Sequence, residues 1–153
     1  MKRAITYLTF LLLIYSIVGI LLLYEKFTLP SPPFRLAFFC GLCGGVGGVT
    51  YCLRGVYRNA CVFNRWNDLW LPWYFIRPLV SFICGMVSCL FLKAGLIILE
   101  AQQINTPTNL AFYALAFIAG LNVDKFIEKI EDIAQVTWGI KKSRTATKED
   151  NNA

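Results

Sequence analysis

Four long apolar segments, separated by short polar or proline-rich breaks, set the pattern of this chain. Residues 6–24 and 36–53 contain no charged side chain, residues 75–99 contain two basic ones, and residues 104–123 have asparagines near both ends. A helix needs about 20 mostly apolar residues to cross the hydrocarbon core of a membrane. The pattern therefore predicts four membrane-spanning helices within residues 1–123.

The lipid environment and the residues between the apolar segments both favour helices. Lipid offers the backbone no hydrogen-bond partner, and four segments are too few to close a β-barrel. Five of the six prolines lie in the breaks or at the starts of spans, where proline interrupts a helix or occupies its first turn: Pro30, Pro32, Pro33, Pro72 and Pro107. We expect an all-α fold, an integral membrane four-helix bundle.

The first span also has features of a signal peptide, because Lys2 and Arg3 precede its apolar run. The run is longer than the roughly 7–15 residues of a signal-peptide core. In addition, Tyr24, Glu25 and Lys26 offer no small-residue cleavage site. We expect this segment to remain as a membrane anchor.

Residues 124–138 follow a different pattern, with apolar side chains at the spacing of one helix face. These side chains are Phe126, Ile127, Ile130, Ile133, Ala134 and Thr137. The opposite face is charged and has more acids than bases, so a bare anionic membrane is a poor partner for it. We expect a C-terminal cytoplasmic amphipathic helix that docks beneath the bundle, with its acids near Arg54, Arg58 and Arg65, or that pairs with a second copy. The polar residues 139–153 are expected to be disordered.

Composition excludes a soluble globule. Hydrophobic residues make up 57% of the 153 residues and charged residues 16%, against about 25% charged in a typical soluble domain. A small soluble domain must cover a large surface with polar groups, and this chain has too few. The lipid bilayer is therefore the first partner that the sequence predicts.

Basic residues are distributed unevenly. Twelve of the 15 lysines and arginines fall at the N-terminus, between Arg54 and Arg77, or from Lys125 onward. The positive-inside rule then places both termini and the middle loop in the cytoplasm, in a cell inner membrane. Trp66, Trp70, Trp73 and Tyr74 are expected to form an interfacial aromatic belt at the middle loop. The loop arginines favour anchoring to anionic headgroups and form no extended patch for nucleic acid.

The second span contains two overlapping G-x-x-x-G pairs, formed by Gly41, Gly44, Gly45 and Gly48. Helices approach closely at glycine, and such packing drives association inside a membrane. The partner is another span of the same chain or, in a homo-oligomer, the same span of a second copy. A glycine-lined pore is a third interpretation.

A polar stripe recurs every four residues along the third span: Arg77, Ser81, Gly85, Cys89 and Lys93. In one interpretation, Arg77 and Lys93 extend to opposite membrane faces while the small residues pack; Lys93 then leans towards Glu100. In the other, Lys93 lines a polar cavity, because an ionisable group inside a span is a functional candidate.

Candidate chemistry is sparse. The chain has no histidine, which is the usual general base and metal ligand, and no carboxylate lies inside a predicted span. Cys40 and Cys43 have C-x-x-C spacing, but cysteine in an apolar span behaves as a small hydrophobic residue; a disulfide or a redox role is the alternative. We predict no catalytic residue, no metal site and no cofactor.

The run from Asn64 to Leu79, with Arg77-Pro78 at the start of the third span, resembles a pattern in small uncharacterised bacterial four-span membrane proteins. Lys93-Ala94-Gly95 and Ala119-Gly120-Leu121 resemble later parts of that pattern, which covers about residues 40–137. The resemblance implies a multi-pass membrane protein. It implies no activity and assigns no site residue.

Three functions stay open from the sequence. The first is a non-enzymatic scaffold or subunit that acts through helix contacts with a membrane protein partner. The second is a small oligomeric pore or membrane effector, and the third is an immunity-type protein against a pore-forming toxin. Each fits the predicted spans, so the packing of the polar and glycine positions must distinguish them.

Overall fold

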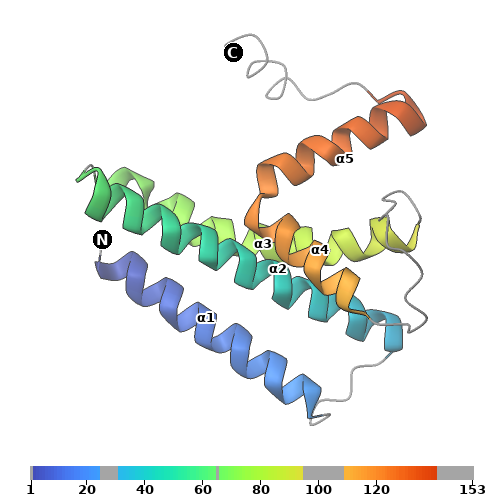
Figure 1. Ribbon diagram of the computed structural model, residues 1–153, viewed down its shortest axis with the longest axis horizontal. Helices are drawn as coiled ribbons and strands as arrows, with labels where there is room; N and C mark the ends of the chain where they lie inside the picture. Colours follow the sequence, from blue (N-terminus) through green and yellow to red (C-terminus); the bar gives the residue numbers. More distant parts are fainter. Residues whose placement is uncertain (1, 25–30, 65, 95–108, 141–153) are drawn as a thin grey trace.

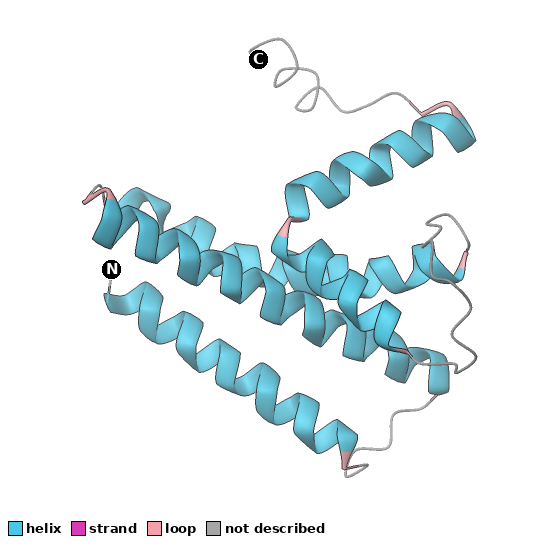
Figure 2. Ribbon diagram, in the orientation of Figure 1, coloured by secondary structure: helices cyan, strands magenta, loops and turns pink. Residues whose placement is uncertain are grey.

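The computed structural model describes residues 2–24, 31–64, 66–94 and 109–140, and these are helical apart from short connections (Figure 2). Three helices are long and two are shorter. In chain order, the elements are α1 (Lys2–Leu23), α2 (Pro32–Tyr57), the π-helical turn η1 (Arg58–Val62), the 3-10 turn η2 (Asp68–Trp70), α3 (Leu71–Lys93), α4 (Leu110–Leu121) and α5 (Val123–Trp138).

Helix α2 is the centre of the molecule. It contacts α1, α3 and α4, and neighbouring long helices run in opposite directions (Figure 1). In the most apolar segment of α2 and η1, 56% of the residues are buried. In the most apolar segment of α1, 11% are buried. Helix α1 is therefore a peripheral helix, and its outward face is apolar.

Helices α1, α2 continued by η1, and α3 are each long and apolar enough to cross a membrane. They correspond to the predicted spans 6–24, 36–53 and 75–99. The helix of the second span continues beyond residue 53 to Val62, and α3 starts at Leu71, earlier than the predicted residue 75. Residues 95–99 lie outside the described residues.

The fourth predicted span, residues 104–123, differs from the others. Within it the structure describes α4, whose 12 residues rise about 18 Å, less than the roughly 30 Å of a hydrocarbon core. Residues 104–108 lie outside the described residues. Helix α5 follows at an angle of 109°, so α4 and α5 together form one bent pair rather than a straight span.

A single residue, Asn122, makes the bend. Its N–H donates to the carbonyl of Ile118 and ends α4, while its own carbonyl accepts the N–H of Phe126 and begins α5. Its backbone angles, φ −123° and ψ 59°, are not helical. Gly139, with φ 68°, ends α5, because a left-handed residue at this place favours glycine.

Glycines bring three backbones together at the middle of the molecule. A Cβ atom on Gly44 of α2 would lie 2.6 Å from the carbonyl oxygen of Ser81 and 2.8 Å from the Cα of Gly85, both in α3. A Cβ on Gly120 of α4 would collide with the carbonyl of Gly44, and one on Gly85 with the carbonyl of Cys40. We call Gly44, Gly85 and Gly120 the glycine seam.

The other glycines of the G-x-x-x-G pairs also lie in contacts within the chain. Gly41 lies against Phe82 and Met86 of α3, and Gly45 lies against the ring of Tyr15 in α1. Gly48 lies against the Ser81 side chain. All four glycines predicted to pack thus face other helices of the same chain.

Alanine in the glycine seam should destabilise the protein. In Gly85→Ala and Gly120→Ala, the new methyl group meets backbone that cannot move aside, and we expect a loss of about 1–3 kcal/mol in each. Gly19→Ala in α1 is the matched control, because a Cβ there meets nothing within 4 Å and alanine favours helix by about 0.5–1 kcal/mol. Thermal unfolding in detergent measures all three; equal effects at the three positions would contradict the close packing.

Candidate functional site

The groove between α2 and α3 runs along both helices, and α4 fills only one half of it. On α2 the face of this groove passes through Gly44, Gly47, Tyr51, Arg54 and Arg58, at steps of three or four residues. Helix α4 covers Gly47, where a Cβ would collide with the carbonyl of Phe117, and Gly44, whose carbonyl a Cβ on Gly120 would meet. Since α4 ends at Leu121, the part of the face from Tyr51 onward stays uncovered.

The predicted polar stripe lines the filled half of the groove. The Ser81 hydroxyl donates to the Gly120 carbonyl at 2.9 Å, and Ser88 donates to the Gly85 carbonyl at 2.8 Å. Cys89 is buried with Cys40 of α2 and Ala116 of α4. Lys93, the last member of the stripe, is exposed because it is the final residue of α3.

Arg77 marks the boundary between the two halves. Its side chain is only 7% exposed, and its Nη1 donates to both carboxylate oxygens of Asp124 at 2.9 Å. The guanidinium also lies over the rings of Tyr51 and Trp73, with its Cζ 5.1 and 5.4 Å from the two ring centroids. A carboxylate and two aromatic rings therefore hold Arg77 within the protein, and Asp124 is its partner at the exposed side of this contact.

Two acids of α5, Asp124 and Glu128, pair with residues other than Arg54 and Arg58. Asp124 pairs with Arg77, and Glu128 pairs with Lys125 of its own helix at 2.7 Å. In the part of the chain that the structure describes, no ion pair joins α5 to Arg54 or Arg58. The reason is the bend at Asn122, which directs α5 away from the bundle (Figure 1). Arg65 and Glu100 lie outside the described residues, so their predicted contacts do too.

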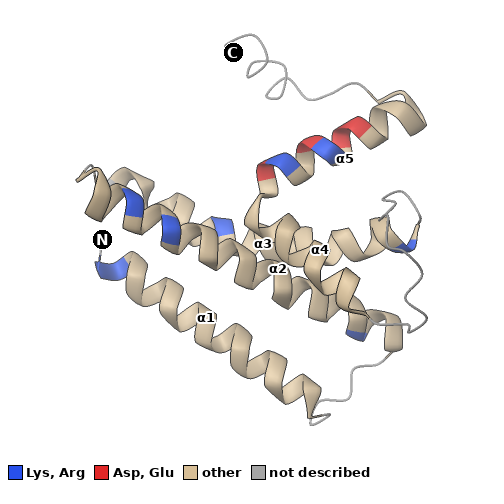
Figure 3. Cartoon of the chain, in the orientation of Figure 1, with Lys and Arg blue, Asp and Glu red and all other residues tan. Residues whose placement is uncertain are grey.

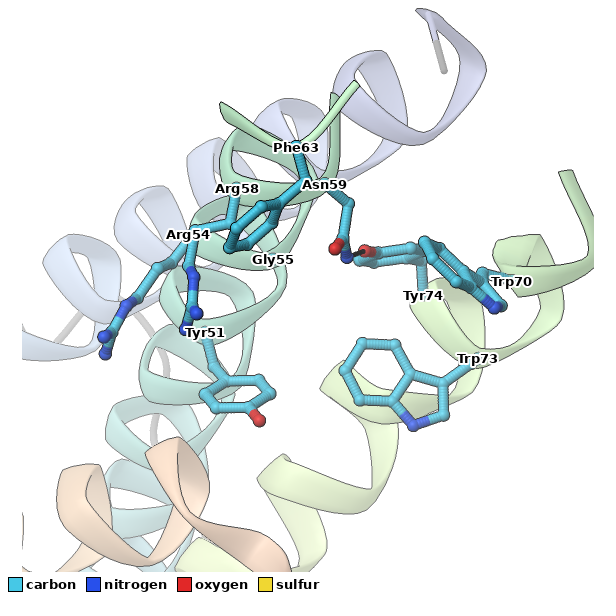
Figure 4. Close-up of a pocket in the computed structure, with 9 residues that line it drawn as sticks. All are labelled: Tyr51, Arg54, Gly55, Arg58, Asn59, Phe63, Trp70, Trp73 and Tyr74. Atoms are coloured by element: carbon cyan, nitrogen blue, oxygen red, sulfur yellow. Dashed lines mark hydrogen bonds between the residues drawn. The ribbon is translucent and has the colours of Figure 1, made fainter. Parts of the chain in front are cut away.

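The open half of the groove is a cleft of about 530 Å³. The rings and side chains that line it come from α2, η1 and the residue after it, η2 and the start of α3 (Figure 4). They are Tyr51, Arg54, Gly55, Arg58, Asn59, Phe63, Trp70, Trp73 and Tyr74. We call this surface the basic cleft.

Several contacts fix the walls of the basic cleft. The Asn59 amide donates to the Tyr74 hydroxyl at 3.5 Å, and the Arg58 Cζ lies 5.5 Å from the centroid of the Phe63 ring. The Trp73 ring meets the Tyr74 ring edge to face at 5.1 Å. Asn64, with φ 48°, lies just beyond η1 in the turn towards α3; asparagine tolerates this left-handed conformation.

Sequence reasoning found parts of this cleft but not the cleft itself. It assigned Arg54 and Arg58 to headgroup anchoring, and Trp70, Trp73 and Tyr74 to an aromatic belt. It missed Tyr51, Asn59 and Phe63. The available signal was the spacing from Gly47 through Tyr51 to Arg58, which continues one helix face. The early end of α4, which leaves that face open, has no comparable signal.

The cysteines are all free, including Cys40 and Cys43, so the structure gives no support to a disulfide between them. Within the described ranges, no group of three or more metal-ligating side chains comes together. The site that the geometry offers is therefore the groove with its half-buried Arg77–Asp124 pair and its basic cleft.

Replacing Asp124 by asparagine should destabilise the protein more than other charge removals on α5. Asp124→Asn leaves the buried Arg77 guanidinium without a countercharge, and a hydrogen bond to a charged group is worth about 1.5–3 kcal/mol. Glu128→Gln is the matched control, because it removes the same charge from a surface pair worth less than about 1 kcal/mol. Unfolding in detergent at low and high salt would measure both; equal losses would contradict the role assigned to the Arg77–Asp124 pair.

Comparison of the chain with protein-family models, with curated proteins and with solved structures finds no match. The function must therefore be inferred from the groove, the Arg77–Asp124 pair and the basic cleft.

Proposed function

We propose that the chain is a non-enzymatic multi-pass protein of the cell inner membrane that acts as a scaffold or subunit through helix contacts. The observation that carries this proposal is that polar side chains of the long helices bond to other helices of the same chain. Ser81 and Arg77 are both bonded to residues of other helices. Polar side chains in lipid that bind neighbouring helices serve assembly, whereas a transport path needs polar groups that face water.

The apolar outer face of α1 is the surface that we assign to a partner. Helix α1 touches α2 and, less, α3, and Phe10, Leu13 and Ile17 on its outer side are exposed. Lipid or another membrane helix can cover such an apolar face. We propose that a membrane protein, or a second copy of this chain, covers it in the assembled complex.

We further propose that the end carrying Lys2, Arg3, Arg54 and Arg58 lies in the cytoplasm. This end combines the start of α1 with the end of α2, whereas the opposite end carries Arg35 and Lys93 (Figure 3). An excess of basic residues marks the cytoplasmic side. Helix α5, with one apolar and one charged face, then lies at the cytoplasmic interface.

Cysteine labelling tests the orientation. Cys61 is exposed in η1 at the proposed cytoplasmic end. A membrane-impermeant maleimide should therefore label it only after the cells are permeabilised. In a variant whose other cysteines are serine, Lys93→Cys at the opposite end serves as the control and should be labelled in intact spheroplasts. Labelling of Cys61 from outside would reverse the proposed orientation.

Cross-linking tests the scaffold proposal. A photo-cross-linking amino acid at Leu13, which is 56% exposed, should form adducts with another membrane protein or a second copy in cells. The same group at Leu8, which is 0% exposed, should react only within the chain. The two positions lie on one helix, so expression and insertion are matched.

Ion conduction by the purified protein would contradict the scaffold proposal. Purified chain in liposomes should raise ion flux no more than protein-free liposomes do. A flux that disappears in Gly44→Leu or Lys93→Leu, but not in Gly19→Leu, would favour the pore instead. Protection of cells from an added pore-forming toxin would favour the immunity-type protein.

A further inference from the structure

We propose that the basic cleft binds the phosphate headgroup of an acidic phospholipid from the cytoplasmic leaflet. The proposal goes beyond the scaffold function and rests only on the membrane insertion and orientation proposed above. Its elements are the height of the cleft along the helices, the two arginines in it, and the end of α4, which leaves it uncovered.

The cleft lies at headgroup height on both of its walls. From Pro32, the first residue of α2, to Tyr51 the chain makes 19 helical steps, which rise about 28 Å. From Lys93, the last residue of α3, back to Trp73 it makes 20 steps, or about 30 Å. The hydrocarbon core is about 30 Å thick. If one end of the bundle lies at one interface, the cleft therefore begins at the other.

The two arginines in the cleft are available to an anion. Arg54 and Arg58 are exposed, and neither is paired with a carboxylate in the described part of the chain. Arg77 behind them is already neutralised by Asp124. The Arg58 Cζ lies over the Phe63 ring, 5.5 Å from its centroid, so an aromatic ring rather than a carboxylate holds this guanidinium at the cleft. The planar guanidinium fork matches the geometry of a phosphate.

The remaining walls suit the boundary between a headgroup and acyl chains. Tyr51, Trp70 and Trp73 present rings with a polar edge, the side chains that favour membrane interfaces. None of the nine lining residues belongs to α4 or α5. The cleft continues the groove that α4 fills, and α4 ends at Leu121 before it covers this part of α2 and α3. Basic pockets between membrane helices on the cytoplasmic side bind acidic lipid headgroups.

Lipid titration with native mass spectrometry of the full chain in detergent tests the proposal. Phosphatidylglycerol is compared with phosphatidylcholine, and inorganic phosphate and glycerol 3-phosphate are added as soluble competitors. In R54Q/R58Q, the first phosphatidylglycerol should bind about 30-fold more weakly, because each arginine near an anionic headgroup contributes about a fivefold change in affinity. Phosphatidylcholine binding should change little.

The matched control is K2Q/R3Q, which removes the same charge from the same end of the molecule but outside the cleft; its affinity should fall less than about threefold. An equal fall in both variants would overturn the proposal in favour of a diffuse charge effect. Equal binding of the two lipids would also overturn it, and displacement by millimolar phosphate would assign the cleft to a soluble anion. Unfolding in lipid-free detergent reports whether R54Q/R58Q folds; if it does not, the single variants R54Q and R58Q should each show about a fivefold loss.

Discussion

The close approach of three backbones at Gly44, Gly85 and Gly120 is the constraint on which the rest of the structure depends. Inside a membrane, apolar side chains gain nothing by leaving lipid, so helices associate through dispersion contacts and hydrogen bonds that need short distances. The glycine seam provides those distances between α2, α3 and α4. It also allows the Ser81 hydroxyl to reach the Gly120 carbonyl, which fixes the height at which α4 ends.

Once α4 ends at that height, Asp124 at the start of α5 reaches Arg77. A charged side chain at membrane depth is costly unless it is paired or faces water. Here Asp124, which remains 75% exposed, supplies the countercharge, and the guanidinium lies over the rings of Tyr51 and Trp73. The buried arginine therefore links α3 to α5 through its ion pair with Asp124, and this contact determines where α5 leaves the bundle.

The same early ending of α4 leaves the basic cleft open. In the proposed membrane orientation, the filled half of the groove lies in the hydrocarbon region and the open half at the headgroups. The proposed scaffold function and the proposed lipid site thus both depend on where α4 ends, but they use different residues. Assembly uses the outer face of α1 and the packed seam, whereas lipid binding uses Arg54 and Arg58, which take no part in helix packing.

The sequence by itself determined the helical class and three helices that could cross a membrane, because the transfer of apolar side chains from water to lipid depends on each segment alone. It also indicated that Gly44 and Gly48 would pack, since the absence of a side chain is a local property. Only the tertiary structure decided that Gly44 meets Gly85 and Gly120, that Arg77 pairs with Asp124, and that Tyr51, Arg58 and Trp73 share one cleft. These contacts join helices that are far apart in the chain. Which residues meet depends on where α4 ends and α5 turns, and no single segment determines that.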